Sequence, residues 1–158
     1  MRFQDYAIQI TQRAVEDLFV AARRVPADKV QWKPLDAGRS TLDIVQECAQ
    51  TPLIAIPILE TRQMPPFSHE ILKAAQERRA QWTTLDECER ICGENSLKLY
   101  EAINEFPDDD LVHTIILPFG GGLVRSMADI SLLHYWNTIY HYGQINYIQT
   151  LLGDFNMH

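Results

Sequence analysis

The stretch SMADISLLHYWNTIYHYGQINYIQTLLG, residues 126–153, predicts one long helix whose buried side carries polar residues. Apolar residues that recur three and four positions apart place one side of this helix against a core. That side is apolar at both ends, but its centre holds His134, Asn137 and His141. A buried imidazole or amide without a partner costs roughly 1–3 kcal/mol. We therefore expect these three side chains to bond to one another, hold water or bind a ligand.

Two further long helices are predicted in the first third of the chain. The first covers residues 3–24 and ends where Pro26 stops it. The second starts after Ser40, which is a suitable N-cap residue. Pro52 and Pro57 follow within this second helix, and they must kink it or cut it into pieces.

The last two long helices each begin at a predicted capping box. Thr84 with Glu87 opens one of them, and Ser126 with Asp129 opens the other. The helix that starts at Ser126 is expected to continue without interruption to Gly153, a residue typical of helix ends.

The remaining segments predict shorter structure. A helical segment is expected from Ser68 to about Arg79, and residues 107–125 form an irregular connection in which Val112 to Ile116 favours an extended strand. Four long helices in a chain of 158 residues predict an all-α fold. We expect a four-helix bundle that forms a single domain over residues 1–158.

Charge and hydropathy exclude two classes of partner. The chain has 21 acidic and 14 basic residues, so its formal net charge is -7. This charge repels phosphate backbones and anionic lipids, which excludes nucleic acid and a membrane surface as partners. No apolar run is expected to reach the ~20 residues that cross a bilayer, and the start of the chain lacks the apolar segment of a signal peptide. We expect a soluble, cytoplasmic protein.

The cysteines predict buried thiols. Cys88 and Cys92 are one helical turn apart on the apolar side of the third long helix, and three cysteines in total cannot all pair. A structural zinc site is not favoured, because the chain has neither a CxxC motif nor a closing pair of ligands.

A metal site of another kind can be assembled across the bundle. Glu47 on the second long helix flanks an apolar stripe, and bundles build metal sites from Glu and His on facing helices. Glu47, His134 and His141 would supply one carboxylate and two imidazoles. The two histidines are seven residues apart, or ~10 Å along the axis, and Asn137 between them is a poor ligand. The alternative is a hydrogen-bonded core network of His134, Asn137, His141 and Asn95 without chemistry.

Two motifs resemble those of the DinB-like proteins. The segment VPADKVQWKPLDAGRSTLDIVQECA, residues 25–49, is similar to the family's approach to the second helix: a proline, a tryptophan two residues before a second proline, then arginine and serine. The segment NTIYHYGQINYIQTLLGD, residues 137–154, resembles the family's fourth-helix signature. That signature has two histidines separated by three residues, followed after one more residue by Gly-Gln.

This resemblance implies a bundle with an up-down-down-up path and a divalent metal held by three histidines. The positions of those ligands fall on Glu47, Asn137 and His141, so one histidine is retained and the metal site is degenerate. His134, one turn earlier, would have to replace Asn137. The metal would be zinc, nickel or iron. Cys48, Asn95 and Thr138 are then expected to line the pocket around it.

Two functional hypotheses follow. In the first, the chain is a metal-dependent hydrolase or thiol transferase, as the resemblance implies, with the metal lowering the pKa of a bound thiol or water. In the second, it is a metal-free bundle that binds a small ligand or a protein partner and catalyses nothing. A second apolar side of the fourth helix also predicts a homodimer, as in many DinB-like proteins. That side consists of Leu133, Trp136, Ile139, Tyr140, Tyr147 and Leu151.

Overall fold

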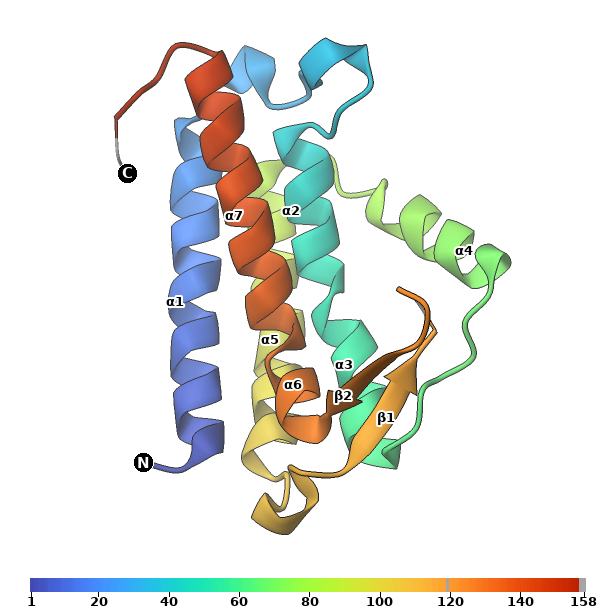
Figure 1. Cartoon of the computed structure of the whole chain (residues 1–158). Coiled ribbons are helices and arrows are strands. Elements are labelled where there is room, and N and C mark those ends of the chain that lie inside the picture. Colours follow the sequence, from blue (N-terminus) through green and yellow to red (C-terminus); the bar gives the residue numbers. More distant parts are fainter. Residues whose placement is uncertain (119, 157–158) are drawn as a thin grey trace.

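The computed structural model describes residues 1–118 and 120–156. Its bundle consists of α1 (Phe3–Arg24), α2 (Thr41–Gln50) with α3 (Pro52–Thr61), α5 (Leu85–Asn104), and α7 (Leu133–Leu151). Helices α1 and α7 lie side by side and run in one direction, whereas α2, α3 and α5 run in the other (Figure 1). The predicted four-helix bundle and its up-down-down-up path are therefore confirmed.

Helix α2 begins at the predicted cap and ends at the first of the two prolines. Ser40 Oγ accepts a hydrogen bond from the Asp43 N–H, and the Asp43 carboxylate accepts one from the Ser40 N–H. The helix ends at Gln50, and Pro52 takes the first position of α3, where a proline nitrogen needs no hydrogen bond. Pro57 lies inside α3 without ending it. The predicted cut therefore occurs at Pro52 alone.

The cap of α5 differs from the predicted box in one bond. Thr84 Oγ1 accepts from the Glu87 N–H at 3.2 Å, as expected. The Glu87 carboxylate, however, accepts from the N–H of Thr83 rather than of Thr84. The loop before α5 therefore carries the second half of the cap one residue earlier.

The last helix is broken, which corrects the prediction of one continuous helix to Gly153. A first short helix, α6 (Met127–Ser131), starts at the predicted capping box of Ser126 and Asp129. Leu132 then has φ of -95° and ψ of 2°, outside the α region, and α7 starts at the next residue. Apolar periodicity does not reveal this break, because the buried side chains continue on the same face on both sides of it.

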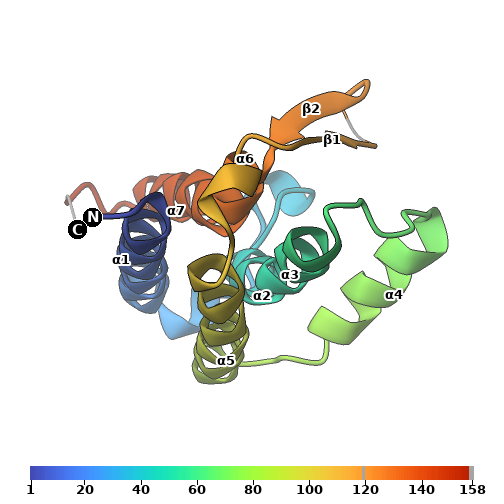
Figure 2. The same ribbon diagram turned by 90° about the horizontal axis from the view of Figure 1, so that it is seen from below.

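The connection before α6 is a β-hairpin rather than one extended run. Strand β1 (Thr114–Leu117) pairs with β2 (Leu123–Ser126) in antiparallel register, with Ile115 opposite Arg125. The strand predicted at Val112 to Ile116 therefore starts two residues too early and ends one residue too early, and its partner strand was not predicted. Glycines 120–122 have φ between +62° and +93°, which side chains disfavour, and they carry the reversal. The hairpin lies near the lower end of the bundle (Figure 1) and projects to its side (Figure 2).

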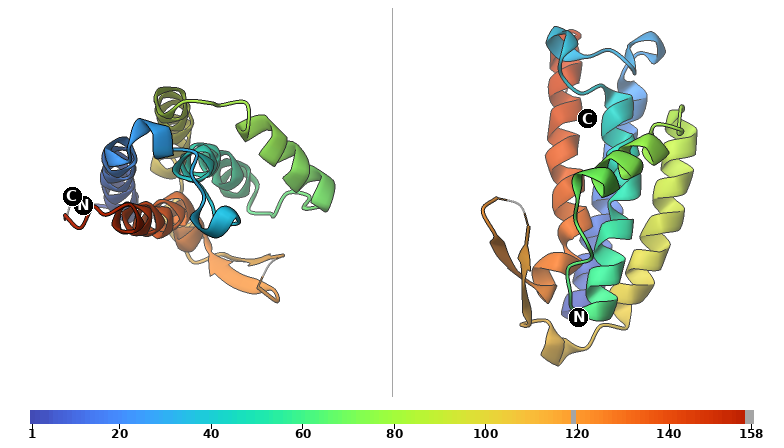
Figure 3. Two further views of the ribbon diagram at one scale, coloured as in Figure 1. Left: turned by 90° about the horizontal axis from the view of Figure 1, so that it is seen from above. Right: turned by 90° about the vertical axis from the view of Figure 1, so that its right-hand side faces the viewer.

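Helix α4 (His69–Arg79) lies outside the bundle, beside α2 and α3 (Figures 2 and 3). It corresponds to the short helix predicted after Ser68, whose Oγ accepts from the Ile71 N–H. None of its residues is buried. Within residues 1–118 and 120–156 there are also three single-turn 3-10 helices: η1 (Ala27–Lys29), η2 (Pro34–Asp36) and η3 (Asp108–Asp110).

The loop that contains η2 holds two residues in the left-handed region. Leu35 and Asp36 have φ of +54° and +56°. The Leu35 side chain is 96% exposed, so no packing compensates for this conformation. The loop continues directly into Arg39 and the cap of α2.

Buried apolar side chains form two clusters between the bundle helices α1, α2 with α3, α5 and α7. The three cysteines belong to the cluster around the upper half of the bundle, and all three are free and buried, as predicted. Burial raises the pKa of the Cys88 and Cys92 thiols to about 12. These thiols are therefore protonated at neutral pH and serve as core side chains.

One stretch of the chain meets the length and hydropathy of a membrane span, contrary to the expectation from the sequence. Within the described residues this is Thr41–Thr61, that is, α2 and α3 together. In the bundle, 67% of its most apolar window is buried against the other helices. That burial is what the core helix of a soluble bundle requires.

Candidate functional site

The centre of the predicted site is the carboxylate of Glu47. Its Oε1 lies 3.1 Å from Nε2 of His141, so that α2 and α7 are joined across the bundle. Nδ1 of His141 lies 2.7 Å from Oε1 of Gln144, one turn further along α7. The ring is buried, with 1% of its surface exposed, and both its nitrogens are engaged. The structure thus brings the side chains of Glu47 and His141 into contact.

Asn137 also belongs to this group, at a longer distance. Its Nδ2 lies 3.5 Å from Oε1 of Glu47. Its Oδ1 lies 3.0 Å from Oγ1 of Thr51, at the junction of α2 and α3. The amide therefore bridges Glu47 and the start of α3.

Two arginines complete the site, and neither is expected there from the sequence. Arg39, in the loop before α2, donates to Oε2 of Glu47. Arg79, the last residue of α4, places Nη2 at 3.3 Å from the same oxygen. The spacing of Arg39 and Glu47 could have indicated their contact, because a long arginine side chain eight residues before Glu47 can reach its carboxylate. No spacing rule pointed to Arg79, which comes from a separate helix.

These partners fix the charge of Glu47. The hydrogen bond from His141, followed by the bond from Arg39, holds the pKa of the Glu47 carboxyl far below its usual range, although burial opposes the shift. The same contact with Glu47 raises the pKa of Arg39. At neutral pH the cluster therefore contains one carboxylate and two guanidinium groups.

His134 lies in a different environment. Its Nε2 is 3.1 Å from Oγ of Ser96, and its Nδ1 is 3.4 Å from Oγ1 of Thr138. The ring is fully buried, and burial lowers its pKa to about 4. None of these contacts is with Glu47, and His134 is neutral at physiological pH. The structure thus places His134 in a hydrogen-bonded core network of its own.

The expected pocket-lining residues also belong to the core. Asn95 donates to the carbonyl of Ala49 at 2.8 Å. Cys48 is fully buried, and Thr138 faces His134. None of the three lines the cavity beside Glu47. The single network of His134, Asn137, His141 and Asn95 is therefore not formed. Asn137 and His141 contact Glu47, whereas His134 bonds to Ser96 and Asn95 bonds to Ala49.

A cavity of about 600 Å³ opens beside the Glu47 cluster. It lies between α3, α4, the segment that joins them and the start of α7. Glu47 lines it together with its partners Arg79 and Asn137, and Gln50, Thr51 and Gln76 are further polar residues of the lining. Apolar side chains make up most of the remaining wall: Leu53, Ile54, Met64, Ile71, Leu72 and Leu133.

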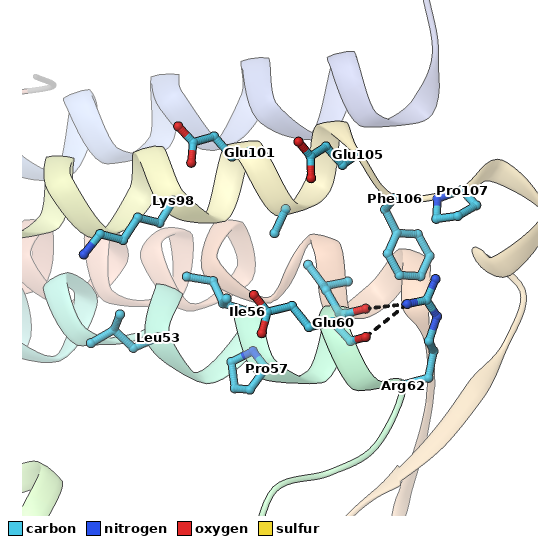
Figure 4. A pocket seen from close by; sticks show the side chains of 12 residues that line it. Leu53, Ile56, Pro57, Glu60, Arg62, Lys98, Glu101, Glu105, Phe106 and Pro107 are labelled. Carbon is cyan, nitrogen blue, oxygen red and sulfur yellow. Dashed lines mark hydrogen bonds between the residues drawn. The ribbon is translucent and has the colours of Figure 1, made fainter.

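A larger cavity of about 700 Å³ lies elsewhere, between α3 and α5 (Figure 4). Glu60, Glu101 and Glu105 line it, with Lys98. Arg62 donates to the carbonyls of Leu59 and Glu60 at one end of it, drawn as dashed lines. No residue of the Glu47 cluster lines this cavity. We therefore place the candidate site at the smaller cavity.

The Glu47 cluster does not fit a divalent metal as it is arranged. No group of three His, Cys, Asp or Glu side chains that could hold a metal occurs within the described part of the chain. The carboxylate oxygens of Glu47 are engaged by His141 and by two guanidiniums. At an effective dielectric constant of 20, two like unit charges 4 Å apart repel each other by about 4 kcal/mol. The repulsion between a doubly charged metal ion and one guanidinium at that distance would be about twice as large.

Comparison with known proteins rests on structure. No protein-family model and no curated protein matches the sequence. The fold is similar to that of YfiT from Bacillus subtilis, described as "a probable metal-dependent hydrolase with an unusual four-helix bundle topology". The TM-score is 0.74 at 12% identity, over 95% of this chain and 87% of that one.

Two further solved structures share the fold. The mycothiol-dependent maleylpyruvate isomerase has a TM-score of 0.71 at 10% identity, over 92% of this chain and 63% of that one. A protein from Streptococcus pneumoniae has a TM-score of 0.72 at 8% identity, over 96% and 93% of the two chains. At these identities the similarity shows the fold alone. This chain has the fold of the DinB-like four-helix bundles, as its two sequence motifs predict.

Proposed function

We propose that this chain binds a small organic molecule in the cavity beside Glu47, without a metal and without catalysing a reaction. The observation that carries this proposal is the pairing of Arg39 and Arg79 with Glu47. In a metal site, a cation gathers the carboxylate and the imidazole. Here two guanidinium groups supply the positive charge that Glu47 requires when it is partly buried.

The cavity supports the binding of a small molecule. Ligand sites are clefts of about 300–1,000 Å³ with mainly apolar walls and a few convergent polar groups. The cavity of about 600 Å³ has this composition, because its lining is mainly apolar and includes Glu47 with its partners Arg79 and Asn137. Helix α4, which supplies one wall, is less tightly packed than the bundle.

A metal-dependent hydrolase or thiol transferase is the second candidate. It is favoured by the approach of His141 to Glu47 at 3.1 Å, since a carboxylate and an imidazole are suitable ligands for zinc, nickel or iron. The description of YfiT as a probable metal-dependent hydrolase favours it too. This function requires both arginines to leave Glu47.

Elemental analysis of protein purified without a His tag distinguishes the two candidates. We expect far less than one equivalent of zinc, nickel or iron, and no heat of binding when these ions are titrated into the protein. His141→Ala is compared with His113→Ala, a variant of an exposed loop histidine. Stoichiometric metal that is lost in His141→Ala but kept in His113→Ala would refute the proposal and establish the second candidate.

We also propose that two copies associate through the outer face of α7. Trp136, Tyr140, Tyr147 and Leu151 are exposed there, and apolar surface of this kind marks interfaces. Leu133, which was assigned to this face, lines the cavity instead. We place the protein in the cytoplasm, because three buried free thiols suit a reducing compartment.

A further inference from the structure

We infer that the ligand of this cavity is an amphipathic organic anion, whose acidic group pairs with Arg79 and whose apolar body lies between α3 and α4. This inference rests on the proposed function and adds the chemical class of the ligand. It is carried by the unbalanced charge of the Glu47 cluster, which borders a mainly apolar cavity.

The charge of the cluster is unbalanced. Arg39 and Arg79 both approach Oε2 of Glu47, and Glu47 is the one carboxylate that pairs with them within the described residues. Two guanidiniums against one carboxylate leave one positive charge without a partner. A bound acid would neutralise that charge in a partly buried position, where an ion pair is screened less than at the surface.

Arg79 is the arginine that can receive the ligand. It lines the cavity, its side chain is 21% exposed, and it meets Glu47 through one nitrogen at 3.3 Å. A guanidinium has five N–H donors in a planar fork that binds carboxylates through two parallel hydrogen bonds. Arg39 lines a different cavity, beside Tyr140 and Tyr147. Arg39 can therefore stay with Glu47 when Arg79 turns toward a ligand.

The walls of the cavity require an apolar body on the ligand. Ile54, Ile71 and Leu72 line it, and each is nearly half exposed. A ligand that covers these side chains removes apolar surface from water, which a small inorganic anion cannot do. The walls and Arg79 together thus select a molecule with one apolar part and one acidic group.

The larger cavity in Figure 4 has more acidic than basic side chains in its lining. Its carboxylates, Glu60, Glu101 and Glu105, outnumber Lys98 and Arg62. An organic anion would be repelled there. Charge therefore distinguishes the two cavities: the larger one has an acidic lining, whereas the smaller one borders a cluster with two arginines and one carboxylate.

Calorimetric titration with three probes tests the inference. 4-Phenylbutyrate has an apolar body and an acidic group, 4-phenylbutanamide has the same body without the charge, and inorganic phosphate has charge alone. We expect 4-phenylbutyrate to bind at least tenfold more tightly than the amide, and phosphate to bind more weakly than either. Arg79→Gln should remove the preference for the acid, whereas Arg90→Gln, in an exposed ion pair on α5, should keep it.

The outcomes separate this inference from the proposed function. Equal affinity for the acid and the amide overturns the inference but leaves a metal-free ligand-binding protein. Phosphate binding as tight as that of 4-phenylbutyrate, or no binding of any probe, also overturns the inference. Stoichiometric metal overturns the proposed function itself. The probe comparison uses the wild-type chain, so it stands even if Arg79→Gln does not fold.

Discussion

Glu47 joins three separate parts of the chain, and Glu47→Gln should therefore destabilise the fold strongly. The substitution keeps the size of the side chain but removes its charge. A hydrogen bond to a charged group contributes about 1.5–3 kcal/mol, and the His141 to Glu47 bond is of this kind. The Arg39 and Arg79 pairs are partly exposed and add about 1 kcal/mol together. We expect a loss of about 3 kcal/mol at pH 7, measured by urea unfolding.

The pH dependence of this loss follows from the lowered pKa of Glu47. The folded state holds Glu47 ionised at pH values where the unfolded chain, with the ordinary carboxyl pKa of 4.5, begins to bind a proton. The stabilisation is complete above pH 4.5 and declines as the pH falls below it toward the folded-state pKa. The difference between wild type and Glu47→Gln should therefore shrink below pH 4.5.

A matched control and a clear refutation are available. Glu16→Gln removes an exposed carboxyl on α1 and should change the free energy of unfolding by less than about 0.5 kcal/mol. If Glu47→Gln costs no more than Glu16→Gln, or if its cost does not vary between pH 7 and pH 3, the carboxylate does not hold the cluster together. If a chelator lowers wild-type stability to that of the variant, a metal stabilises the site instead.

Three further outcomes are expected. Burial lowers the pKa of His134 to about 4, so the unfolded chain binds a proton before the folded chain as the pH falls below 6.5. The free energy of unfolding should therefore decline by on the order of 3 kcal/mol between pH 6.5 and 4. NMR titration of the ring should give a pKa near 4, and a value above 6 would contradict this prediction. Analytical ultracentrifugation at micromolar concentration should give a mass near twice 18.2 kDa, and Tyr147→Glu should give a monomer; one monomeric wild-type species excludes the dimer. Leu35→Gly should raise the free energy of unfolding by about 1 kcal/mol, because glycine adopts a positive φ without strain. Leu35→Ala keeps a Cβ and should not raise it. Equal effects of the two substitutions would show that the loop is unstrained.

The sequence was informative where local chemistry determines structure. Ser40 with Asp43 and Ser126 with Asp129 start helices because their side chains satisfy N–H groups within four residues, and such bonds depend on spacing alone. The break at Leu132 was not visible. It separates two helices whose buried faces continue one another, so apolar periodicity is the same with or without it.

The candidate site was only partly predictable, for a related reason. The resemblance to DinB-like proteins brought Glu47, Asn137 and His141 together, and the structure places them side by side. The partners that decide the charge of the site, Arg39 and Arg79, come from a loop and from a helix outside the bundle. Their positions depend on tertiary packing, which residue spacing does not encode.

The exposed position of α4 determines how a molecule would enter the site. With no buried residue, α4 is held by fewer apolar contacts than the bundle helices, and it should therefore open at a lower free energy than any of them. Its amide hydrogens should exchange with solvent before those of α2 and α7. Because Arg79 is its last residue, each opening would carry one guanidinium away from Glu47 and leave Arg39 and His141 in place. Entry and release of a ligand would then proceed by detachment of a single peripheral helix, while the four rods of the bundle remain closed.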